Sequence, residues 1–264
     1  MITIDGRDML TTLEELVEPR FTALVLVDIM NDYCTPGGYF DKAGADISTL
    51  KLVPKRVKPV LEAARSAGVL IVHVQQTLYP GHKVSSGPYL RMGYIKMTLS
   101  RQQGSGRAQG NPVPSSGVSI IDTWGWQIVD ELTPKPGELI VRKHRSSAFA
   151  GTDLDMILRT NGIRSIVVVG DVTEGCAGST AIDAQFHDYY PVVLRDCVAT
   201  TEQDVHEAMM FLLTRRLDVV DSADVLKIWS GKTSVRPIPK ARTKTRRRGQ
   251  RFRDTHVTVT RPRV

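Results

Sequence analysis

The sequence predicts an α/β fold of three layers (α-β-α), in which helices cover both faces of a doubly wound, mostly parallel sheet of about six strands. Two observations carry this prediction. Short apolar runs rich in β-branched residues alternate along the chain with longer segments of helical periodicity. The runs are also continuously apolar, which is typical of strands that are buried on both faces of a parallel sheet.

The first part of the chain contains a strand, a helix and a second strand. Residues 23–27 (ALVLV) are an uninterrupted apolar run and predict the first strand. Residues 53–67 place apolar side chains every three or four positions, as the buried face of a helix requires, and Gly68 supplies a C-cap. Residues 69–74 (VLIVHV) return to a continuous apolar run and predict the next strand.

The second part of the chain continues this alternation. Residues 138–141 follow the turn PKPG and predict the third strand, and the helix at 152–160 begins with Thr152 as its N-cap. Apolar runs then predict three further strands, and amphipathic segments predict three further helices. These strands are 166–169, 192–194 and 218–220, and the helices are 175–189, 203–215 and 221–229.

Residues 76–137 interrupt the rhythm, because Gly, Ser and Pro are frequent there and no strong period is present. Long loops within compact domains usually serve a function or are mobile. We expect this excursion to lie over the carboxyl edge of the sheet and to help shape a pocket.

Charge divides the chain into a body at residues 1–230 and a basic C-terminal tail at residues 231–264. The tail holds twelve of the 35 Lys and Arg residues, and Asp254 is its single acid, so the body itself carries an excess of acidic residues. The tail has few large apolar residues, and we interpret it as a mobile extension. The alternative is an arm that contacts nucleic acid or another polyanion, although the tail contains no recognisable nucleic-acid motif.

Composition also excludes a transmembrane protein. No apolar run approaches the ~18 residues that a membrane helix needs, and the N-terminus lacks the basic and apolar regions of a signal peptide. The three cysteines are an odd number, which favours free thiols over a disulfide framework. We therefore expect a cytoplasmic protein that does not bind membranes.

Polar residues that leave the carboxyl ends of the predicted strands are the first candidates for chemistry. Asp28 ends the first strand, Lys143 ends the third, and Cys176 lies at the N-terminus of the helix after the fourth. The helix dipole and a nearby ammonium should both lower the pKa of the Cys176 thiol. Structural alternatives are a small buried side chain for Cys176, a turn cap for Asp28 and a solvated lysine for Lys143. We assign Cys34 and Cys197 to packing.

Three motifs resemble the isochorismatase-like cysteine hydrolases, which have a Rossmann-like fold. The motifs are ALVLVDIMNDYCTPGG, VRKHRSSAF and VVVGDVTEGCAGSTAIDA, in the family's order, and the resemblance spans roughly residues 20–228. The superfamily includes nicotinamidases, N-carbamoylsarcosine hydrolases, biuret hydrolases and ureidoacrylate hydrolases. The ureidoacrylate and biuret group is the most similar, because TPGGYFDKAGADIS and WGWQIVDELTPKPGE both resemble ureidoacrylate hydrolase.

This resemblance implies a catalytic triad of Asp28, Lys143 and Cys176, with Cys176 as the nucleophile. It also implies a cis peptide bond between Asp171 and Val172, which would aim the backbone N–H groups of Val172 and Cys176 at an oxyanion. The implied activity is hydrolysis of a C–N bond in a small ureido or carboxamide compound, through a thioester and with release of ammonia or an amine. Cys176 favours this activity over vinyl-ether cleavage, because the branch that cleaves ethers lacks the cysteine.

We expect no cofactor and no metal. Nicotinamidases carry a metal site of Asp and His residues just after the second strand, where this chain reads HVQQTLYPGHK. His73 and His82 are nine residues apart, and the intervening glutamines are poor metal ligands. We interpret His73 as a core histidine whose ring is satisfied by hydrogen bonds.

The expected partner is a small-molecule substrate, and residues near strand ends or in the excursion are candidates for binding it. Gln and Asn side chains can donate to and accept from a ureido group, and Arg145 can pair a carboxylate in bidentate fashion. For Trp124 and Trp126 we favour packing over contact with substrate. The binding candidates are Asn31, Tyr39, Gln75, Gln76, His144, Arg145 and Phe149.

The sequence leaves two functions open. The first is the amidohydrolase, and the second is a catalytically silent scaffold or binding module whose basic tail contacts a polyanion. An intact set of Asp, Lys and Cys argues against silence. The resemblance also implies a homo-oligomer, either a dimer or a tetramer, and contact with nucleic acid is expected only through the tail.

Overall fold

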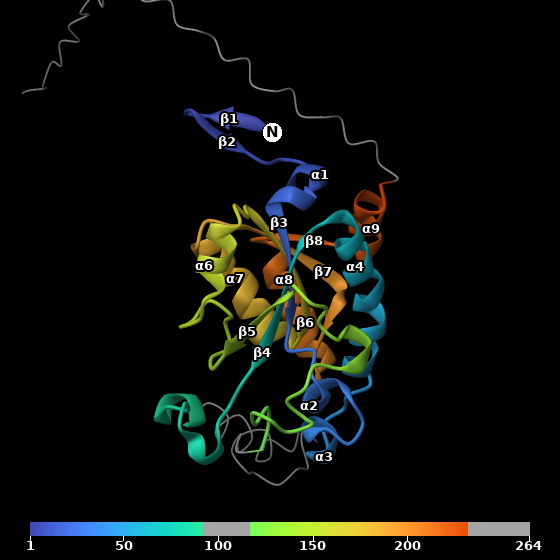
Figure 1. The fold of residues 1–264 in the computed structure, drawn as a ribbon, viewed down its shortest axis with the longest axis vertical. Coiled ribbons are helices and arrows are strands. Elements are labelled where there is room, and N and C mark those ends of the chain that lie inside the picture. Colours follow the sequence, from blue (N-terminus) through green and yellow to red (C-terminus); the bar gives the residue numbers. More distant parts are fainter. Residues whose placement is uncertain (92–116, 232–264) are drawn as a thin grey trace, which may run out of the picture. The chain divides into compact units, whose positions relative to one another are not determined.

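The computed structural model describes residues 1–91 and 117–231 and confirms the predicted three-layer α/β fold. Its parallel sheet has six strands in the order β5-β4-β3-β6-β7-β8 (Figure 1). The chain starts this sheet at β3 and extends it in both directions, as in doubly wound folds. The strands are β3 (Thr22–Val27), β4 (Leu70–Gln76), β5 (Leu139–Lys143), β6 (Ser165–Asp171), β7 (Tyr190–Ala199) and β8 (Asp218–Val220).

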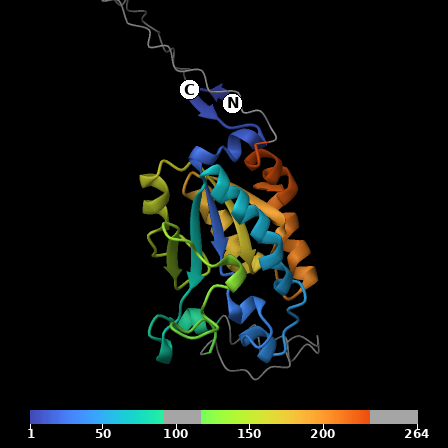
Figure 2. The ribbon, with the colours of Figure 1, turned by 45° about the vertical axis from the view of Figure 1, so that its right-hand side comes forward.

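Helices cover both faces of the sheet (Figures 1 and 2). On one face, α4 (Val53–Ala67) packs against α9 (Ser222–Trp229). On the other face, α6 (Leu154–Thr160), α7 (Gly178–Phe186) and α8 (Gln203–Thr214) contribute to a second core. The short helices are α1 (Leu13–Leu16), α2 (Asn31–Cys34) and α3 (Tyr39–Lys42).

Strand β3 shows why the apolar runs are continuous, because all of its residues are buried. Leu24 and Leu26 belong to the core beneath α4 and α9. Ala23, Val25 and Val27 point the other way and belong to the core beneath α6, α7 and α8. A central strand of a three-layer fold therefore needs an apolar side chain at every position.

The N-terminus forms a two-stranded antiparallel hairpin that was not predicted. Strands β1 (Ile2–Ile4) and β2 (Arg7–Met9) are exposed along their whole length and project beyond the sheet (Figure 2). Asp5 and Gly6 join them, with φ of 48° and 76°. An Asp-Gly pair adopts two consecutive positive φ angles more readily than most residue pairs, so Asp5-Gly6 is a sequence signal for a hairpin turn.

The helix expected at residues 175–189 begins later, at Gly178. A π-helical turn, Thr173–Ala177, comes first, and within it Gly175 has non-helical backbone angles. The carbonyl oxygen of Val172 closes this turn by accepting from the N–H groups of Gly175 and Ala177. Cys176 therefore lies in an irregular turn before the helix and not in the first turn of α7.

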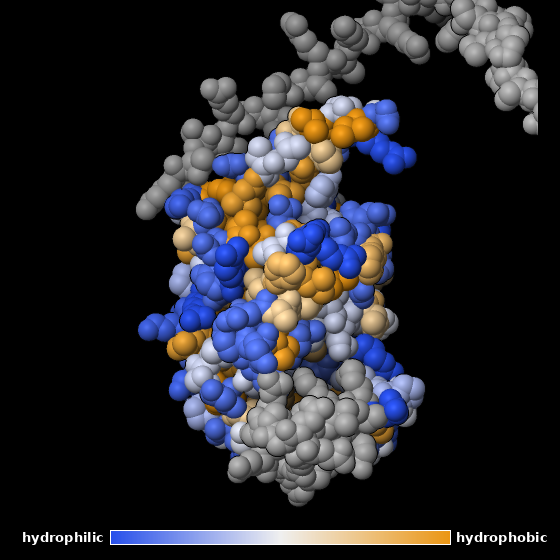
Figure 3. All heavy atoms as spheres, turned by 180° about the vertical axis from the view of Figure 1, so that it is seen from behind, coloured by the Kyte–Doolittle hydropathy of each residue, from blue (hydrophilic) through white to orange (hydrophobic). Residues whose placement is uncertain are grey.

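Hydrophilic side chains cover much of the face seen in Figure 3, with hydrophobic side chains between them. Exposed aromatic residues of the described chain include Phe186 on α7 and Phe211 on α8. Each has an arginine over its ring, with Arg216 5.7 Å from the centroid of Phe186 and Arg215 5.6 Å from that of Phe211.

Two predictions concern segments outside the described residues. These are the basic tail, of which only Gly231 is described, and residues 92–116 of the excursion. Within the described ranges, no helix is long and apolar enough to cross a membrane.

Candidate active site

The sheet brings Asp28, Lys143 and Cys176 to one edge. Asp28 follows β3, Lys143 is the last residue of β5, and Cys176 lies in the turn after β6. The carboxylate of Asp28 lies 2.7 Å from the ammonium of Lys143, measured from Oδ2 to Nζ. The thiol of Cys176 lies near enough to both side chains for each of them to shift its pKa. The three residues that the sequence singled out therefore form one cluster.

The backbone of Asp28 directs its carboxylate into this cluster. Its φ is 54°, in the left-handed region, which Asp tolerates better than most residues. Its N–H donates to the carbonyl oxygen of Val74 at 2.9 Å and thereby continues the β3–β4 ladder. The side chain is 1% exposed, and its Oδ1 accepts from the backbone N–H of Gln76 at 2.6 Å. Both carboxylate oxygens are thus held in place.

Lys143 is fully buried, which is rare for a lysine and requires acceptors for all its protons. Besides Asp28, its Nζ donates to Oε1 of Gln76 at 2.6 Å and to the carbonyl oxygen of Arg145 at 3.1 Å. Burial lowers the pKa of Lys143, but the interactions with Asp28 above all, and with Cys176, outweigh burial and raise it above its usual range. Lys143 is therefore an ammonium, which excludes the solvated loop lysine considered above.

Glycines make room for the loop that carries Cys176. Gly170 has φ of 116°, and a Cβ at this position would collide with the carbonyl oxygen of Val27. A Cβ at Gly175 would lie 2.8 Å from Cγ2 of Val172. The peptide bond between Asp171 and Val172 is cis. The loop after β6 thus passes close to β3 and packs on its own first residue.

The expected low pKa of Cys176 is wrong. Burial raises the pKa of the thiol to about 12; the Lys143 ammonium opposes this rise, and the Asp28 carboxylate adds to it. Burial is the main reason for the difference. In addition, the thiol lies before α7 and not at its first turn, and it faces a carboxylate as well as an ammonium. Cys176 itself is only partly buried. The resting site therefore holds a neutral thiol beside a carboxylate that can accept its proton.

Two of the binding candidates come from consecutive positions of β4 and have different surroundings. Gln76 contacts both Asp28 and Lys143. Gln75 instead donates its Nε2 to the carbonyl oxygen of Trp126 at 2.7 Å. Asn31 on α2 makes a similar structural contact, because its Nδ2 donates to the carbonyl oxygen of Trp124 at 3.0 Å.

The other candidates lie around the cluster or in the core. His144 donates from Nδ1 to the carbonyl oxygen of Thr77 at 2.7 Å. Nη1 of Arg145 donates to the carbonyl oxygens of Val84 and His144. His144 and Arg145 both line an open pocket of about 440 Å³. Tyr39 begins α3 and is partly buried. Phe149 is buried and stacks on His187 at 4.7 Å, so it belongs to the core beneath α6 and α7.

Sequence reasoning missed Tyr89, in the described part of the excursion. Its ring lies over the guanidinium of Arg145 at 5.4 Å. Burial raises the pKa of Tyr89, and the charges of Cys176, Lys143 and Asp28 also act on it, which places the phenol near the cluster. The position of Tyr89 depends on how the excursion folds back, and the local sequence contains no signal for that.

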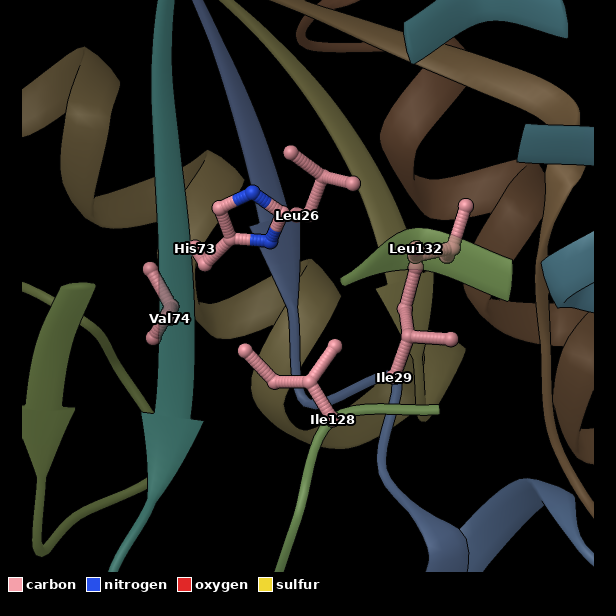
Figure 4. A pocket seen from close by; sticks show the side chains of 6 residues that line it. All are labelled: Leu26, Ile29, His73, Val74, Ile128 and Leu132. Carbon is pink, nitrogen blue, oxygen red and sulfur yellow. The ribbon is translucent and has the colours of Figure 1, made fainter. Parts of the chain in front are cut away.

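His73 lies in an apolar niche beside β4, and none of the other residues that line this niche belongs to the cluster (Figure 4). Leu26, Ile29 and Ile128 are among the side chains around it. Burial lowers the pKa of His73, and its Nε2 lies 2.9 Å from Oε2 of Glu138. The ring is thus satisfied in the core. In residues 1–91 and 117–231, no group of three or more His, Cys, Asp or Glu residues is placed to hold a metal ion.

The region that holds the sheet and the cluster matches a known protein family. The family model for the isochorismatase domain matches residues 22–224, which covers the whole six-stranded sheet. The chain belongs to the isochorismatase family. The match includes all three residues of the cluster and ends within α9.

Solved structures of the isochorismatase family share the fold. An isochorismatase family protein from Desulfovibrio vulgaris is 26% identical, with a TM-score of 0.62 over 80% of this chain and 99% of that one. N-carbamoylsarcosine amidase from Thermoplasma acidophilum is 27% identical, with a TM-score of 0.56 over 76% and 96%. The pyrazinamidase of Pyrococcus horikoshii, solved in complex with zinc, is 25% identical, with a TM-score of 0.56 over 76% and 99%. The chain is therefore an isochorismatase-like hydrolase with amidases among its structural neighbours.

Proposed function

We propose that this protein is a cysteine-dependent amidohydrolase that cleaves a C–N bond of a small ureido or carboxamide compound and releases ammonia or an amine. The observation that carries the proposal is the ion pair of Asp28 and Lys143 beside Cys176, whose thiol pKa both side chains influence. Nucleophile, proton acceptor and cation are the three groups that acyl transfer through a thioester needs.

The first step forms a bond between sulfur and the carbonyl carbon. Asp28 takes the thiol proton as the sulfur attacks, because the thiol is neutral before attack. The carbonyl oxygen becomes an oxyanion, for which we propose the backbone N–H groups of Val172 and Cys176 as donors. The ammonium of Lys143 compensates the charge that builds up on the sulfur and stays within 2.7 Å of Asp28.

The second step breaks the C–N bond. Asp28 returns the proton to the departing nitrogen, which leaves as ammonia or an amine, and the acyl group stays on Cys176 as a thioester. Asp28 then removes a proton from water, whose oxygen attacks the thioester carbon. The acid or carbamate leaves, the sulfur regains a proton, and the resting thiol is restored.

The substrate class rests on similarity. The motifs of the ureidoacrylate and biuret group, together with the structural neighbour that is an N-carbamoylsarcosine amidase, support a ureido compound or a related carboxamide. Amide groups near the cluster, such as that of Gln76, suit a ureido group because they both donate and accept.

Ammonia release from a panel of ureido acids, acylureas and carboxamides tests this proposal. We expect turnover of at least one member by the wild-type protein and its loss in Cys176→Ser and Asp28→Asn. Cys197→Ser is the matched control, because Cys197 is buried and its Sγ contacts the carbonyl oxygen of Arg56 outside the cluster. Ammonia release from no member, or equal release by Cys176→Ser, would contradict the assignment.

A further inference from the structure

Gln76 connects the two charged residues of the cluster. In the sheet, β4 lies between β3 and β5, and Gln76 is the register partner of Lys143. Its backbone N–H donates to Oδ1 of Asp28, and its side-chain Oε1 accepts from Nζ of Lys143, both at 2.6 Å. Strand β4, which carries none of the three residues of the cluster, therefore supplies Gln76, and Gln76 hydrogen-bonds with both Asp28 and Lys143.

The orientation of the Gln76 amide is fixed by chemistry. An ammonium has protons to donate and no lone pair to accept with, so the amide oxygen must face Lys143. Flipping the amide would set two donors against each other. Nε2 therefore points away from Lys143.

This Nε2 is a buried donor without an acceptor. Gln76 is 3% exposed, and no residue within 1–91 or 117–231 accepts a hydrogen bond from its Nε2. The neighbouring Gln75 is equally buried, yet its Nε2 donates to the carbonyl oxygen of Trp126. A buried N–H with no partner costs free energy, so an acceptor that arrives with the substrate would bind favourably there.

The acceptor must differ from the carbonyl oxygen that is attacked. Cys176 and the proposed oxyanion donors follow β6, whereas Gln76 ends β4, and β3 lies between these two strands. The attacked oxygen is assigned to the backbone N–H groups of Val172 and Cys176, which are separate donors from the side chain of Gln76. The side-chain Nε2 of Gln76 and the oxyanion donors would therefore bind different oxygen atoms of one substrate.

We infer that Gln76 is a positioning residue for Lys143 and Asp28 and that its Nε2 selects substrates carrying a second acceptor oxygen, such as the distal carbonyl of an acylurea. The inference rests on the proposed function and deepens it. It predicts discrimination between compounds that differ in one oxygen.

Acetylurea and ethylurea form such a pair, because they differ in one carbonyl oxygen. Gln76→Glu keeps an acceptor for Lys143 and loses the N–H donors, whereas Gln76→Met loses both contacts. Gln75→Met is the matched control on the same strand. We expect wild-type kcat/KM to favour acetylurea, and we expect Gln76→Glu to reduce this preference by about 10-fold, mainly through KM. Comparing each substrate across variants cancels its intrinsic reactivity.

The positioning role has a readout that needs no substrate. Lys143 lowers the pKa of the Cys176 thiol, so Gln76→Met, which frees Lys143 from one acceptor, should shift the pH midpoint of iodoacetamide alkylation of Cys176. Gln75→Met should leave that midpoint unchanged. Thermal melting shows whether each variant is folded. If Gln76→Met is not folded, Gln76→Ala, which also lacks the acceptor for Lys143, takes its place.

The outcomes separate the two proposals. A wild-type enzyme that releases ammonia but keeps the same acetylurea preference in Gln76→Glu, or hydrolyses ethylurea better than acetylurea, overturns the role of Gln76 alone. An alkylation midpoint unaffected by Gln76→Met overturns the positioning role. Ammonia release from no compound in the panel overturns the proposed function and, with it, the selection by Nε2.

Discussion

The thiol of Cys34 donates a hydrogen bond to Oδ2 of Asp171 across 2.8 Å, so two buried acids share one contact just before the loop that carries Cys176. Burial raises the pKa of both groups well above their ordinary values, and the charge of Asp28 raises both further. Burial and the charge of Asp28 therefore both favour the protonated forms of Cys34 and Asp171. Asp28, in contrast, lies 2.7 Å from the ammonium of Lys143.

Asp171 should make stability fall as pH rises. The folded protein keeps the Asp171 proton to higher pH than the unfolded chain, whose carboxyl has the ordinary pKa of 3.8, so stability falls as pH rises above that value. Asp171→Asn should therefore gain about 1–3 kcal/mol relative to wild type between pH 4 and pH 7. Urea denaturation at both pH values measures the gain. A difference between the two proteins that does not change with pH would contradict a neutral Asp171.

Glu138 should make stability rise with pH, in contrast to Asp171. Burial works against its charge, but hydrogen bonds from Arg65, the Lys135 backbone and His73 lower the pKa of Glu138 to about 2. Its contribution to stability is present above pH 4.5 and is lost as pH falls toward 2. Glu138→Gln should cost about 2 kcal/mol at pH 7 and less at pH 4.

The same denaturation series includes Glu131→Gln as a control, because Glu131 is exposed and lies in a neighbouring turn. We expect Glu131→Gln to change stability by less than about 0.5 kcal/mol at either pH. A cost of Glu138→Gln that grows on acidification would show that Glu138 does not hold its charge in the folded state.

Gly170 should be irreplaceable for steric reasons. Its φ of 116° and the nearby carbonyl oxygen of Val27 leave no room for a Cβ. Gly170→Ala should lose at least about 3 kcal/mol of stability, because β6 must move away from β3. Gly162→Ala is the control: φ is 67° there and no atom lies within 4 Å of a Cβ, so the cost should be about 1 kcal/mol. Equal losses in thermal melting would contradict the close approach of β6 to β3.

Alkylation of Cys176 should depend on its two charged neighbours in opposite ways. Asp28 raises the pKa of the thiol and Lys143 lowers it. Asp28→Asn should therefore increase the rate of iodoacetamide labelling at pH 8 by about 10-fold, and Lys143→Met should decrease it. Both variants should lose turnover. Slower labelling of Asp28→Asn than of wild type would mean that the carboxylate does not face the sulfur.

Much of the candidate site could be predicted because Asp28, Lys143 and Cys176 are each a polar side chain at or just after the end of a buried apolar run. Asp28 and Lys143 are recognisable in this way from the chain alone, since parallel strands bring their carboxyl ends to one edge. The pKa of Cys176 was not predictable. Its direction depends on the balance of burial, Asp28 and Lys143, and that balance is set by tertiary distances.

Gln75 and Gln76 show a second limit. Two consecutive glutamines are equivalent as letters, and both qualify as partners for a ureido group. Strand pleating sends successive side chains to opposite faces of the sheet, so one of them meets Trp126 and the other meets Lys143. The register between β4 and β5 decides which of the two glutamines meets Lys143, and the sequence alone does not specify that register. The hairpin at Asp5-Gly6, in contrast, was predictable from its turn.

The most direct test of the account is a search for the acyl group on Cys176. A substrate that the wild-type protein hydrolyses is mixed with it, the reaction is quenched with acid during turnover, and the digested protein is analysed by mass spectrometry. We predict the mass of the substrate's acyl part on the peptide that contains Cys176, and in Cys176→Ala its absence together with at least about a 10³-fold loss of turnover. Wild-type turnover by Cys176→Ala, or an adduct on another residue, would contradict a thioester at Cys176.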